Sequence, residues 1–226
     1  HTAVCLSLQT EQSVTSTIIE YLSTNWLGLT GFVSGLLCVW LLIKENIWTF
    51  PLGLLYSVVT VVVMYNTQLY ADVLLNFYYV LMNAYGWFFW IRGGQTRRSE
   101  VDELMVAWLP RPQWRSVVLI STSGIIAMGW YFDTFTNAAF AYADSFTTIL
   151  SFVAMWMSAR KYLDSWILWF IVNVVSVVLY LAKAEDDSQL YFYVVLYTIY
   201  IGLAIQGWYA WQKHLLSKQG SPVNTE

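Results

Sequence analysis

The sequence is poor in charge and in cysteine, and these shortages exclude several classes of protein. Only 11% of its 226 residues are charged, whereas a soluble domain carries about 25%, so a water-facing surface could hardly be covered. The two cysteines, Cys5 and Cys38, are far apart and suggest neither a disulfide framework nor a metal motif. We therefore expect no metal and no cofactor. A net charge of -3 without a basic face argues against nucleic-acid binding.

Long uncharged apolar runs take the place of that charge. A helix needs about 20 apolar residues to cross a bilayer, whereas barrel strands are shorter and alternate in polarity. The sequence therefore predicts an all-α membrane protein with seven transmembrane helices. The seven runs are approximately Trp26–Ile43, Ile47–Tyr65, Ala71–Ile91, Ser116–Phe132, Ala138–Ala159, Trp166–Ala182 and Leu190–Trp211.

The connections between these runs differ in charge. Counted alternately, one set of connections holds ten of the eleven lysines and arginines, and the other set holds only Lys183. The positive-inside rule assigns basic connections to the cytoplasm. We therefore expect the N-terminus outside and the C-terminus in the cytoplasm. A count of six spans would destroy this partition.

Spans one to three resemble spans five to seven, which leaves the fourth as a linker. Two copies of three helices with the same orientation need such an odd helix between them, so we predict two parallel three-helix repeats (3+1+3). Transporters with parallel repeats bind substrate at mid-membrane between the repeats. Chance similarity among aromatic-rich helices is the alternative. The matching motifs are Gln68-Leu69-Tyr70 with Gln189-Leu190-Tyr191, Gly86-Trp87-Phe88-Phe89-Trp90 with Gly207-Trp208-Tyr209-Ala210-Trp211, and Trp40 and Lys44 with Trp156 and Arg160.

This organisation divides the chain into five segments. We expect an extracytoplasmic tail at 1–24, a first repeat at 25–91, a cytosolic loop and linker helix at 92–137, a second repeat at 138–212 and a cytosolic tail at 213–226.

Two local motifs carry further expectations. Pro51 and Gly53 lie in the second span, where a proline removes a helical hydrogen bond, so we expect either a hinge or a static kink there. The two Gly-Trp-rich endings, 86–90 and 207–211, we interpret mainly as interfacial anchors, since tryptophan concentrates at headgroup depth.

Polar and aromatic side chains form stripes within the spans. Ionisable residues inside a membrane usually face the protein interior or a water-filled cavity, and residues three, four or seven apart share a helix face. Each polar residue could instead simply bond across a helix interface. Asp72 could be hydrated at a span end, and Trp166 could be an anchor. The candidate binding residues are Trp48, Gln68, Asp72, Asn76, Asp144, Thr147, Trp166, Trp169, Asn173, Tyr193 and Tyr197.

The composition of these stripes indicates a kind of substrate. No lysine or arginine lies inside a predicted span, whereas a phosphate ester would need basic partners or helix N-termini. Tryptophans with aspartates suit a flat neutral or cationic solute, because a cation over an aromatic face gains about 0.5–2 kcal/mol. Amides and hydroxyls would bond a polyhydroxyl portion.

These motifs resemble the PnuC family of bacterial nicotinamide riboside transporters over about residues 25 to 212. The resemblance implies a 3+1+3 fold related to the SWEET sugar transporters, in the bacterial inner membrane, and a homotrimer. It also implies uptake of nicotinamide riboside by facilitated diffusion, followed by intracellular phosphorylation. The motifs that carry it are Tyr70-Ala71-Asp72-Val73-Leu74-Leu75-Asn76, Asn83-Ala84-Tyr85-Gly86-Trp87 with Trp90, Asp144-x-x-Thr147, and Trp166-x-x-Trp169-x-x-x-Asn173.

Two other functions compete with this interpretation. One is transport of another small solute, such as a sugar or a vitamin precursor. The other is an intramembrane aspartyl hydrolase that uses Asp72 and Asp144, which would require the two carboxylates to share a proton. No buried histidine, lysine or glutamate is predicted, so the sequence offers few groups that could couple transport to an ion. We therefore favour energy-independent transport.

Overall fold

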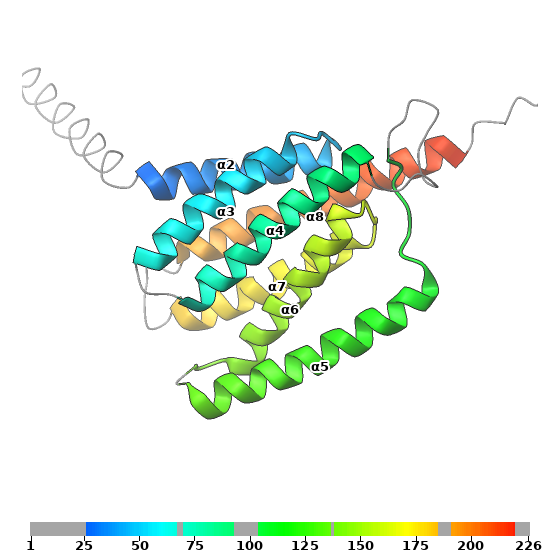
Figure 1. The fold of residues 1–226 in the computed structure, drawn as a ribbon. Coiled ribbons are helices and arrows are strands. Elements are labelled where there is room, and N and C mark those ends of the chain that lie inside the picture. The colour runs from blue at the N-terminus through cyan, green and yellow to red at the C-terminus, as the bar shows by residue number, and fades with distance from the viewer. Residues whose placement is uncertain (1–25, 67–69, 93–103, 137, 185–190, 220–226) are drawn as a thin grey trace, which may run out of the picture.

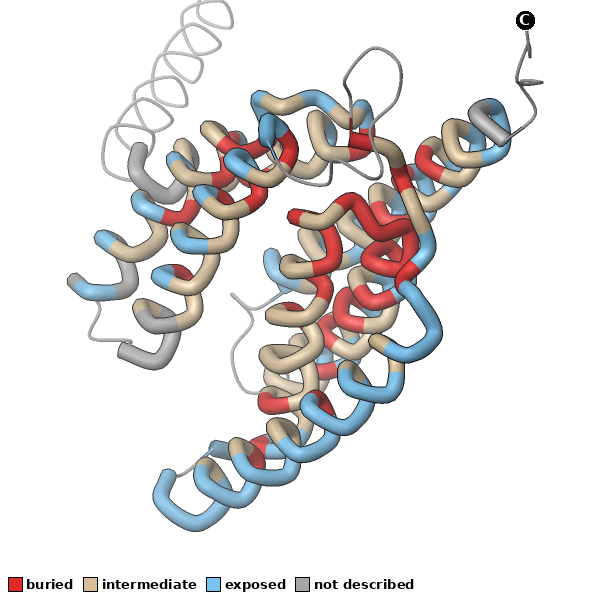
Figure 2. Tube along the Cα trace, turned by 45° about the vertical axis from the view of Figure 1, so that its right-hand side comes forward, coloured by how far each residue is buried: buried red, intermediate tan, exposed pale blue. Residues whose placement is uncertain are grey.

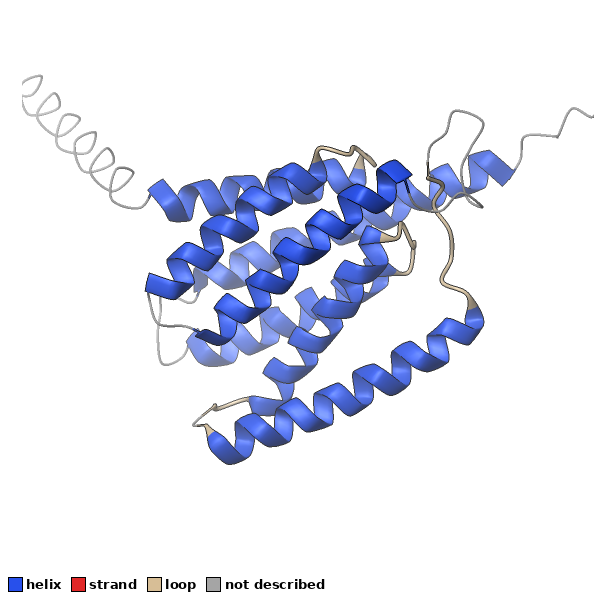
Figure 3. Ribbon diagram, viewed as in Figure 1, coloured by secondary structure: helices blue, strands red, loops and turns tan. Residues whose placement is uncertain are grey.

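The protein is a bundle of α-helices (Figures 1 and 3). The computed structural model describes residues 26–66, 70–92, 104–136, 138–184 and 191–219, and every regular element there is a helix. The prediction of an all-α protein with helices at the seven apolar runs is confirmed for these residues. The helices are α2 (Trp26–Ile43), α3 (Thr49–Asn66), α4 (Tyr70–Arg92), α5 (Arg111–Phe135), α6 (Ala141–Ala159), α7 (Ser165–Ala184) and α8 (Tyr191–Gln219).

The outer surface of this bundle is suited to lipid. By length and composition, three of the described helices could cross a membrane: α5, α7 and the part of α8 at Tyr191–Ser217. Shorter apolar stretches lie in α2 and α3. Large apolar side chains such as Leu119 and Val178 are exposed, and an exposed apolar surface of this kind marks a membrane or a partner.

The helices pack as two groups of three. Helices α2, α3 and α4 pack in sequence and form the first half, while α6, α7 and α8 form the second half. The halves meet through α4 against α6 and α2 against α8, whereas α5 packs along α6 and leaves its outer face exposed (Figure 2).

One end of the bundle holds most of the buried apolar side chains. We call it the basic end, because Lys44, Arg92, Arg160 and Lys161 lie where α2, α4 and α6 finish. A buried cluster joins residues of both halves with Leu104 and Val106 of the segment 104–109 that precedes α5. The members of its core are Ile43, Phe50, Trp90, Leu104, Val106, Leu163, Trp166, Ala204 and Trp211.

The segment 104–109 is fixed to the loop between α6 and α7. Ala107 exchanges backbone hydrogen bonds with Lys161 and Leu163 at 3.2 and 2.9 Å, and the Leu109 amide donates to Asp164 Oδ2 at 2.6 Å. These bonds satisfy backbone groups that burial would otherwise leave unpaired. The segment therefore belongs to the packed core of the basic end.

Pro51 does not soften its helix. Because α3 begins at Thr49, Pro51 lies in the first turn, where backbone N–H groups have no intrahelical acceptor in any case. The expected loss of a hydrogen bond inside the second span is therefore wrong. Pro112 likewise lies in the first turn of α5, which starts earlier than the predicted span because proline fits that position.

An aromatic–glycine contact fixes the basic end of the first half. Trp90 packs edge-on against Phe50, with ring centroids 4.9 Å apart. A side chain at Gly86 would collide with the Phe50 ring, so glycine is what lets α4 approach α3 there. We call Phe50, Gly86 and Trp90 the first-half aromatic contact.

The second half repeats this arrangement. Trp211 packs edge-on against Trp166 at 5.4 Å, and a side chain at Gly207 would collide with the Trp166 ring. We call these three residues the second-half aromatic contact. The two contacts also touch each other, since the rings of Trp90 and Trp211 lie 6.4 Å apart.

The interpretation of the two Gly-Trp-rich endings as interfacial anchors is therefore wrong for their first and last residues. Gly86, Trp90, Gly207 and Trp211 are buried, and Trp211 is fully so. Only residues between them, such as Tyr209, lie on the outside of the bundle. Sequence alone gave no way to separate a tryptophan at headgroup depth from one packed into a core at the same depth.

Candidate substrate-binding site

The predicted stripe of tryptophan and asparagine residues lies on the face of α7 that points into the bundle. Trp166, Asn173 and Ser176 are buried, and Trp169 is half-buried. Their spacing places them along one side of the helix. Trp169 is held in place because its indole Nε1 donates a hydrogen bond to Ser158 Oγ on α6, 3.1 Å away.

A buried polar stripe on α4 is the counterpart in the first half. Asn76 and Asn83 are buried, and Tyr79 lies between them on the same face. Asn83 donates from Nδ2 to the Tyr79 carbonyl at 2.8 Å. Its amide lies against Gly53 of α3, where any side chain would overlap it.

Hydrogen bonds join this stripe to α6 across the boundary between the halves. The Tyr78 hydroxyl donates to the Phe152 carbonyl at 2.9 Å, and the Tyr79 hydroxyl is bonded to the Ser151 hydroxyl. The polar face of α4 therefore points at the second half rather than at lipid.

A group of tyrosines lies where α3, α4, α7 and α8 converge. Tyr197 lies near Tyr56, Tyr79, Tyr180 and Tyr200, so phenols from both halves share one region. Tyr180 stacks on Tyr197 with centroids 5.3 Å apart. This tyrosine cluster gives the interface between the halves several hydroxyl groups and flat ring faces.

Some predicted residues belong to this interface and others do not. Asn76, Trp169, Asn173 and Tyr197 lie on the faces just described. Tyr193 is exposed and extends the tyrosine cluster outward, since its ring stacks on that of Tyr180 with centroids 4.9 Å apart.

Trp166 lies at the basic end of the α7 stripe, deep in the packed core. Its side chain is only 2% exposed, and Gly207 and Trp211 cover its ring. The indole Nε1 finds no hydrogen-bond partner among the described residues. In this conformation a substrate could stack on Trp169 more readily than on Trp166.

Asp144 and Thr147 of α6 already form polar contacts within the second half. Asp144 binds Lys183 in the last turn of α7 at 2.9 Å, and both side chains are partly exposed. Thr147 donates to carbonyls of its own helix. Either group would have to exchange a partner before it could bind a substrate.

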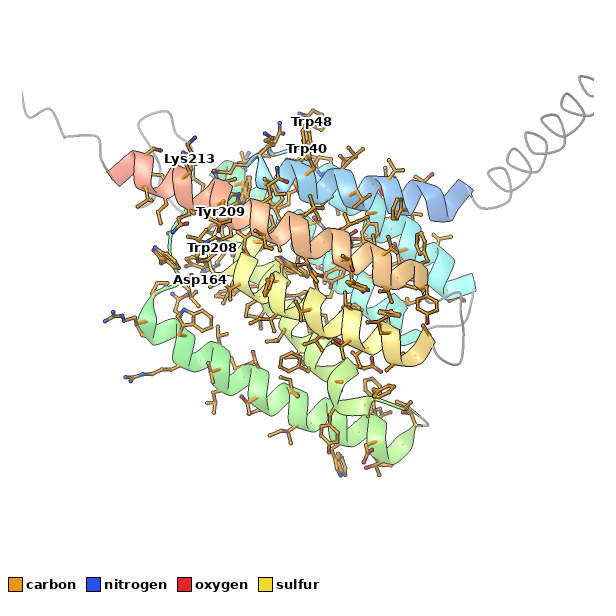
Figure 4. The ribbon with its side chains drawn as sticks, turned by 180° about the vertical axis from the view of Figure 1, so that it is seen from behind. Trp40, Trp48, Asp164, Trp208, Tyr209 and Lys213 are labelled. Atoms are coloured by element: carbon orange, nitrogen blue, oxygen red, sulfur yellow. The ribbon has the colours of Figure 1, made fainter. Side chains whose placement is uncertain are left out.

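Trp48 lies in the loop between α2 and α3 and is 65% exposed. Figure 4 shows it on the outside of the bundle, as it does Trp40. Gln68 is outside the described residues. Asp72 belongs to α4, but its side chain is likewise outside the described part of the structure.

The tyrosine cluster was largely missed by sequence reasoning. Tyr56, Tyr79, Tyr180 and Tyr200 sit in aromatic-rich apolar runs, where a phenol looks like any other large side chain. One signal was available for Tyr79, because it lies three residues after Asn76 and four before Asn83, on their face of the helix.

Basic groups are kept to the ends of the described helices. Arg160, at the end of α6, donates from Nε to the Tyr85 hydroxyl at 2.9 Å. Burial opposes its charge, but hydrogen bonds and charge interactions with Tyr85 and Tyr162 outweigh this, so the pKa of Arg160 lies above its usual value. It remains a cation beside the aromatic rings of the basic end.

Comparison with known proteins places this fold in a family. The profile of the nicotinamide mononucleotide transporter family matches residues 25–213. The chain belongs to this family. Its relatives include the nicotinamide riboside transporter PnuC of Escherichia coli K12, 32% identical over 180 residues that cover 69% of this chain and 74% of that one. The PnuC relative of Neisseria mucosa is 27% identical and covers 84% and 73%.

Two further similarities bear on the fold and on the breadth of the family. A riboflavin/roseoflavin transporter, RibM of Streptomyces davaonensis, is 23% identical over 82% of this chain and 84% of its own. The crystal structure of the vitamin B3 transporter PnuC superimposes with a TM-score of 0.69, at 23% identity, over 96% of this chain and 92% of that one.

The resemblance to the PnuC family is thus confirmed, and the chain is a membrane transporter rather than an enzyme. The aspartyl hydrolase alternative falls with it, because the relatives are transporters.

Proposed function

We propose that this transporter takes up nicotinamide riboside across the bacterial inner membrane by facilitated diffusion. The observation that carries the proposal is the composition of the interface between the halves. It combines a fixed tryptophan, buried amides and the tyrosine cluster, and the described basic residues that join the halves, Arg160 and Lys161, lie at its basic end. The PnuC relatives named for nicotinamide riboside support the same substrate.

The lack of described basic side chains toward the middle of the interface favours nicotinamide riboside over nicotinamide mononucleotide, the compound in the family's description. A phosphate needs charge-assisted hydrogen bonds, most often from arginine or lysine, and the described basic residues lie at the helix ends. A pyridinium ring on an uncharged ribose needs only an aromatic face and neutral polar partners.

The residues divide by the part of the substrate they suit. We propose that Trp169 stacks on the ring, and that Trp166 joins it once the basic end has opened and uncovered its ring. Asn173 would bond the carboxamide. The proposed ribose partners are Gln68, Asn76, Thr147, Tyr193 and Tyr197, with Asp72, Asp144 and Trp48 at the entrances.

We also propose the 3+1+3 arrangement with alternating access between two parallel repeats, related to the SWEET transporters. Matching aromatic–glycine contacts in the two halves and the separate packing of α5 on α6 support it. The outward N-terminus rests on the distribution of basic residues. The homotrimer rests on the family resemblance alone.

A binding titration with purified protein tests the substrate. Nicotinamide riboside should bind, the mononucleotide should compete poorly, and simple sugars should not compete. Riboflavin belongs in the same panel because of the RibM relative. Preference for the mononucleotide would overturn the argument from charge, and preference for riboflavin or a sugar would replace the proposed substrate.

Uptake into liposomes tests the energetics. With substrate on one side, uptake should stop at equal concentrations whether or not a proton or sodium gradient is imposed. Accumulation driven by either gradient would contradict facilitated diffusion.

A further inference from the structure

Two charged residues of opposite sign occupy matching places in the two halves. Glu45 lies two residues after the end of α2, and Lys161 lies two residues after the end of α6. Both adopt the left-handed backbone conformation, with φ of 54° and 59°. Each follows a basic residue, Lys44 in one half and Arg160 in the other.

These two side chains pair with each other inside the basic end. Lys161 Nζ lies 2.7 Å from Glu45 Oε2, and the side chains are only 5% and 14% exposed. Their geometry is that of a close ion pair rather than an aligned hydrogen bond. Lys161 also donates to the Leu104 carbonyl at 2.7 Å and lies 4.7 Å from the centre of the Trp90 ring. His214 Nδ1 of α8 lies 2.5 Å from the other oxygen of Glu45.

The charged contacts run between the halves. Glu45 belongs to the first half, and its partners Lys161 and His214 belong to the second. Lys161 in turn contacts Glu45 and Trp90, both of the first half. Separation of the halves at this end would therefore leave charges without partners in a region of low exposure, which is costly.

Stability of the fold is a weak explanation for such a pair. Desolvation offsets much of the attraction in a buried ion pair, so replacement by apolar groups is often neutral for stability. Its geometric effect is clearer, because it fixes the position of one half relative to the other. The ion pair of Asp144 with Lys183 differs, since it lies wholly within the second half.

We propose that the Glu45–Lys161 pair, completed by His214, holds the basic end closed, and that the pair must separate when substrate leaves or enters there. This rests on the proposed alternating access but not on the identity of the substrate. The aromatic contacts and the Trp211 hydrogen bond to the Leu42 carbonyl at 3.1 Å would then open together with it.

Thiol labelling tests this directly. Ala204 is 2% exposed within the cluster that joins the halves, so Ala204→Cys, in a chain whose Cys5 and Cys38 are replaced by serine and alanine, reports opening of the basic end. In the purified protein without substrate, Lys161→Ala and Glu45→Gln should each raise the labelling rate about tenfold, equivalent to about 1.4 kcal/mol. Asp133→Asn, a control on the exposed part of α5, should not change it.

Further variants separate opening from misfolding. If either single variant aggregates on gel filtration, the double variant Glu45→Gln, Lys161→Met leaves no unpaired charge and should still label faster than the parent. Labelling at the parent rate in a monodisperse variant would overturn the proposal. Because no substrate is present, a wrong substrate assignment would leave this result unchanged.

Discussion

The two halves of this transporter share a framework and differ in the faces they turn toward each other. At the basic end, the first-half and second-half aromatic contacts place an aromatic ring on a glycine in the same way. One turn along, the first half has Gly53 with the Asn83 amide against it, and the second half has Trp169 hydrogen-bonded to Ser158. The two halves are thus packed alike at the basic end. They differ toward the middle of the bundle, where we place the substrate.

The largest expected effect comes from breaking the shared framework. Gly86→Ala and Gly207→Ala each force a methyl group into a buried ring, and overpacking of this kind costs about 1–3 kcal/mol. For a chain of this size, each kcal/mol lowers Tm by about 2–4 °C. Thermal unfolding of the purified protein measures it.

Gly202→Ala is the matched control on α8, because a side chain there meets no atom within 4 Å. It should leave Tm unchanged or raise it slightly. Trp166→Phe should partly restore Gly207→Ala but not Gly86→Ala. Equal destabilisation by all three alanines would show that the two glycines have no special packing role.

A somewhat smaller effect is expected from replacing Trp169, the side chain in which the second half differs from the first. Trp169→Ala should weaken nicotinamide riboside binding about 30-fold, the effect of losing about 2 kcal/mol from a central aromatic contact. Trp169→Phe should lose less, because a ring remains. Titration calorimetry measures both, with Trp130→Ala on the exposed face of α5 as control. Unchanged affinity in Trp169→Ala would refute the stacking role.

In the first half, changes at the contact between Gly53 and Asn83 should lower the stability of the fold more than the affinity for substrate. Gly53→Ala should cost about 1 kcal/mol because it displaces the Asn83 amide, and Asn83→Ala should remove most of that cost, as coupled neighbours do. A double-mutant cycle of unfolding temperatures measures the coupling. Asn76→Ala in place of Asn83→Ala should not restore the stability lost in Gly53→Ala. If both asparagine variants restored it, the assigned contact between Gly53 and Asn83 would be wrong.

The smallest effect is expected at the end away from the basic loops. Asp144→Asn removes an ion pair whose partners are 38% and 31% exposed, and such pairs contribute about 0–1 kcal/mol. The difference in Tm from the parent should shrink further in high salt. Asp133→Asn on the exposed part of α5 is the control. A large, salt-independent loss would contradict the assignment of this pair as an exposed, weakly stabilising one.

The helices could be predicted from the sequence because their cause is local. Each apolar run forms its own backbone hydrogen bonds, and in a membrane no other arrangement satisfies them except a closed barrel. Charge in the connections is equally local, so the partition of basic residues could be seen at once. Helix ends shifted by a few residues where Pro51 and Pro112 lie in the first turn of a helix.

The inward-facing polar and aromatic residues were predicted only where their chemistry stands out against the apolar background. Trp169, Asn173 and Asn76 could be found because tryptophan and amides repeat along one face. The tyrosine cluster could not, since its members come from four helices and only packing brings them together. Trp48 was a candidate binding residue, yet it lies in an exposed loop, because α3 begins one residue later.

By itself, the sequence determined the helices, the paucity of charge inside them and the family, since all three depend on composition and on motifs along one stretch of chain. Tertiary structure alone decided which tryptophans are core and which are surface, and that Glu45 meets Lys161 across 116 positions of sequence. The physical reason is distance along the chain: a contact between the halves depends on how two helix triplets pack, and no local pattern records it.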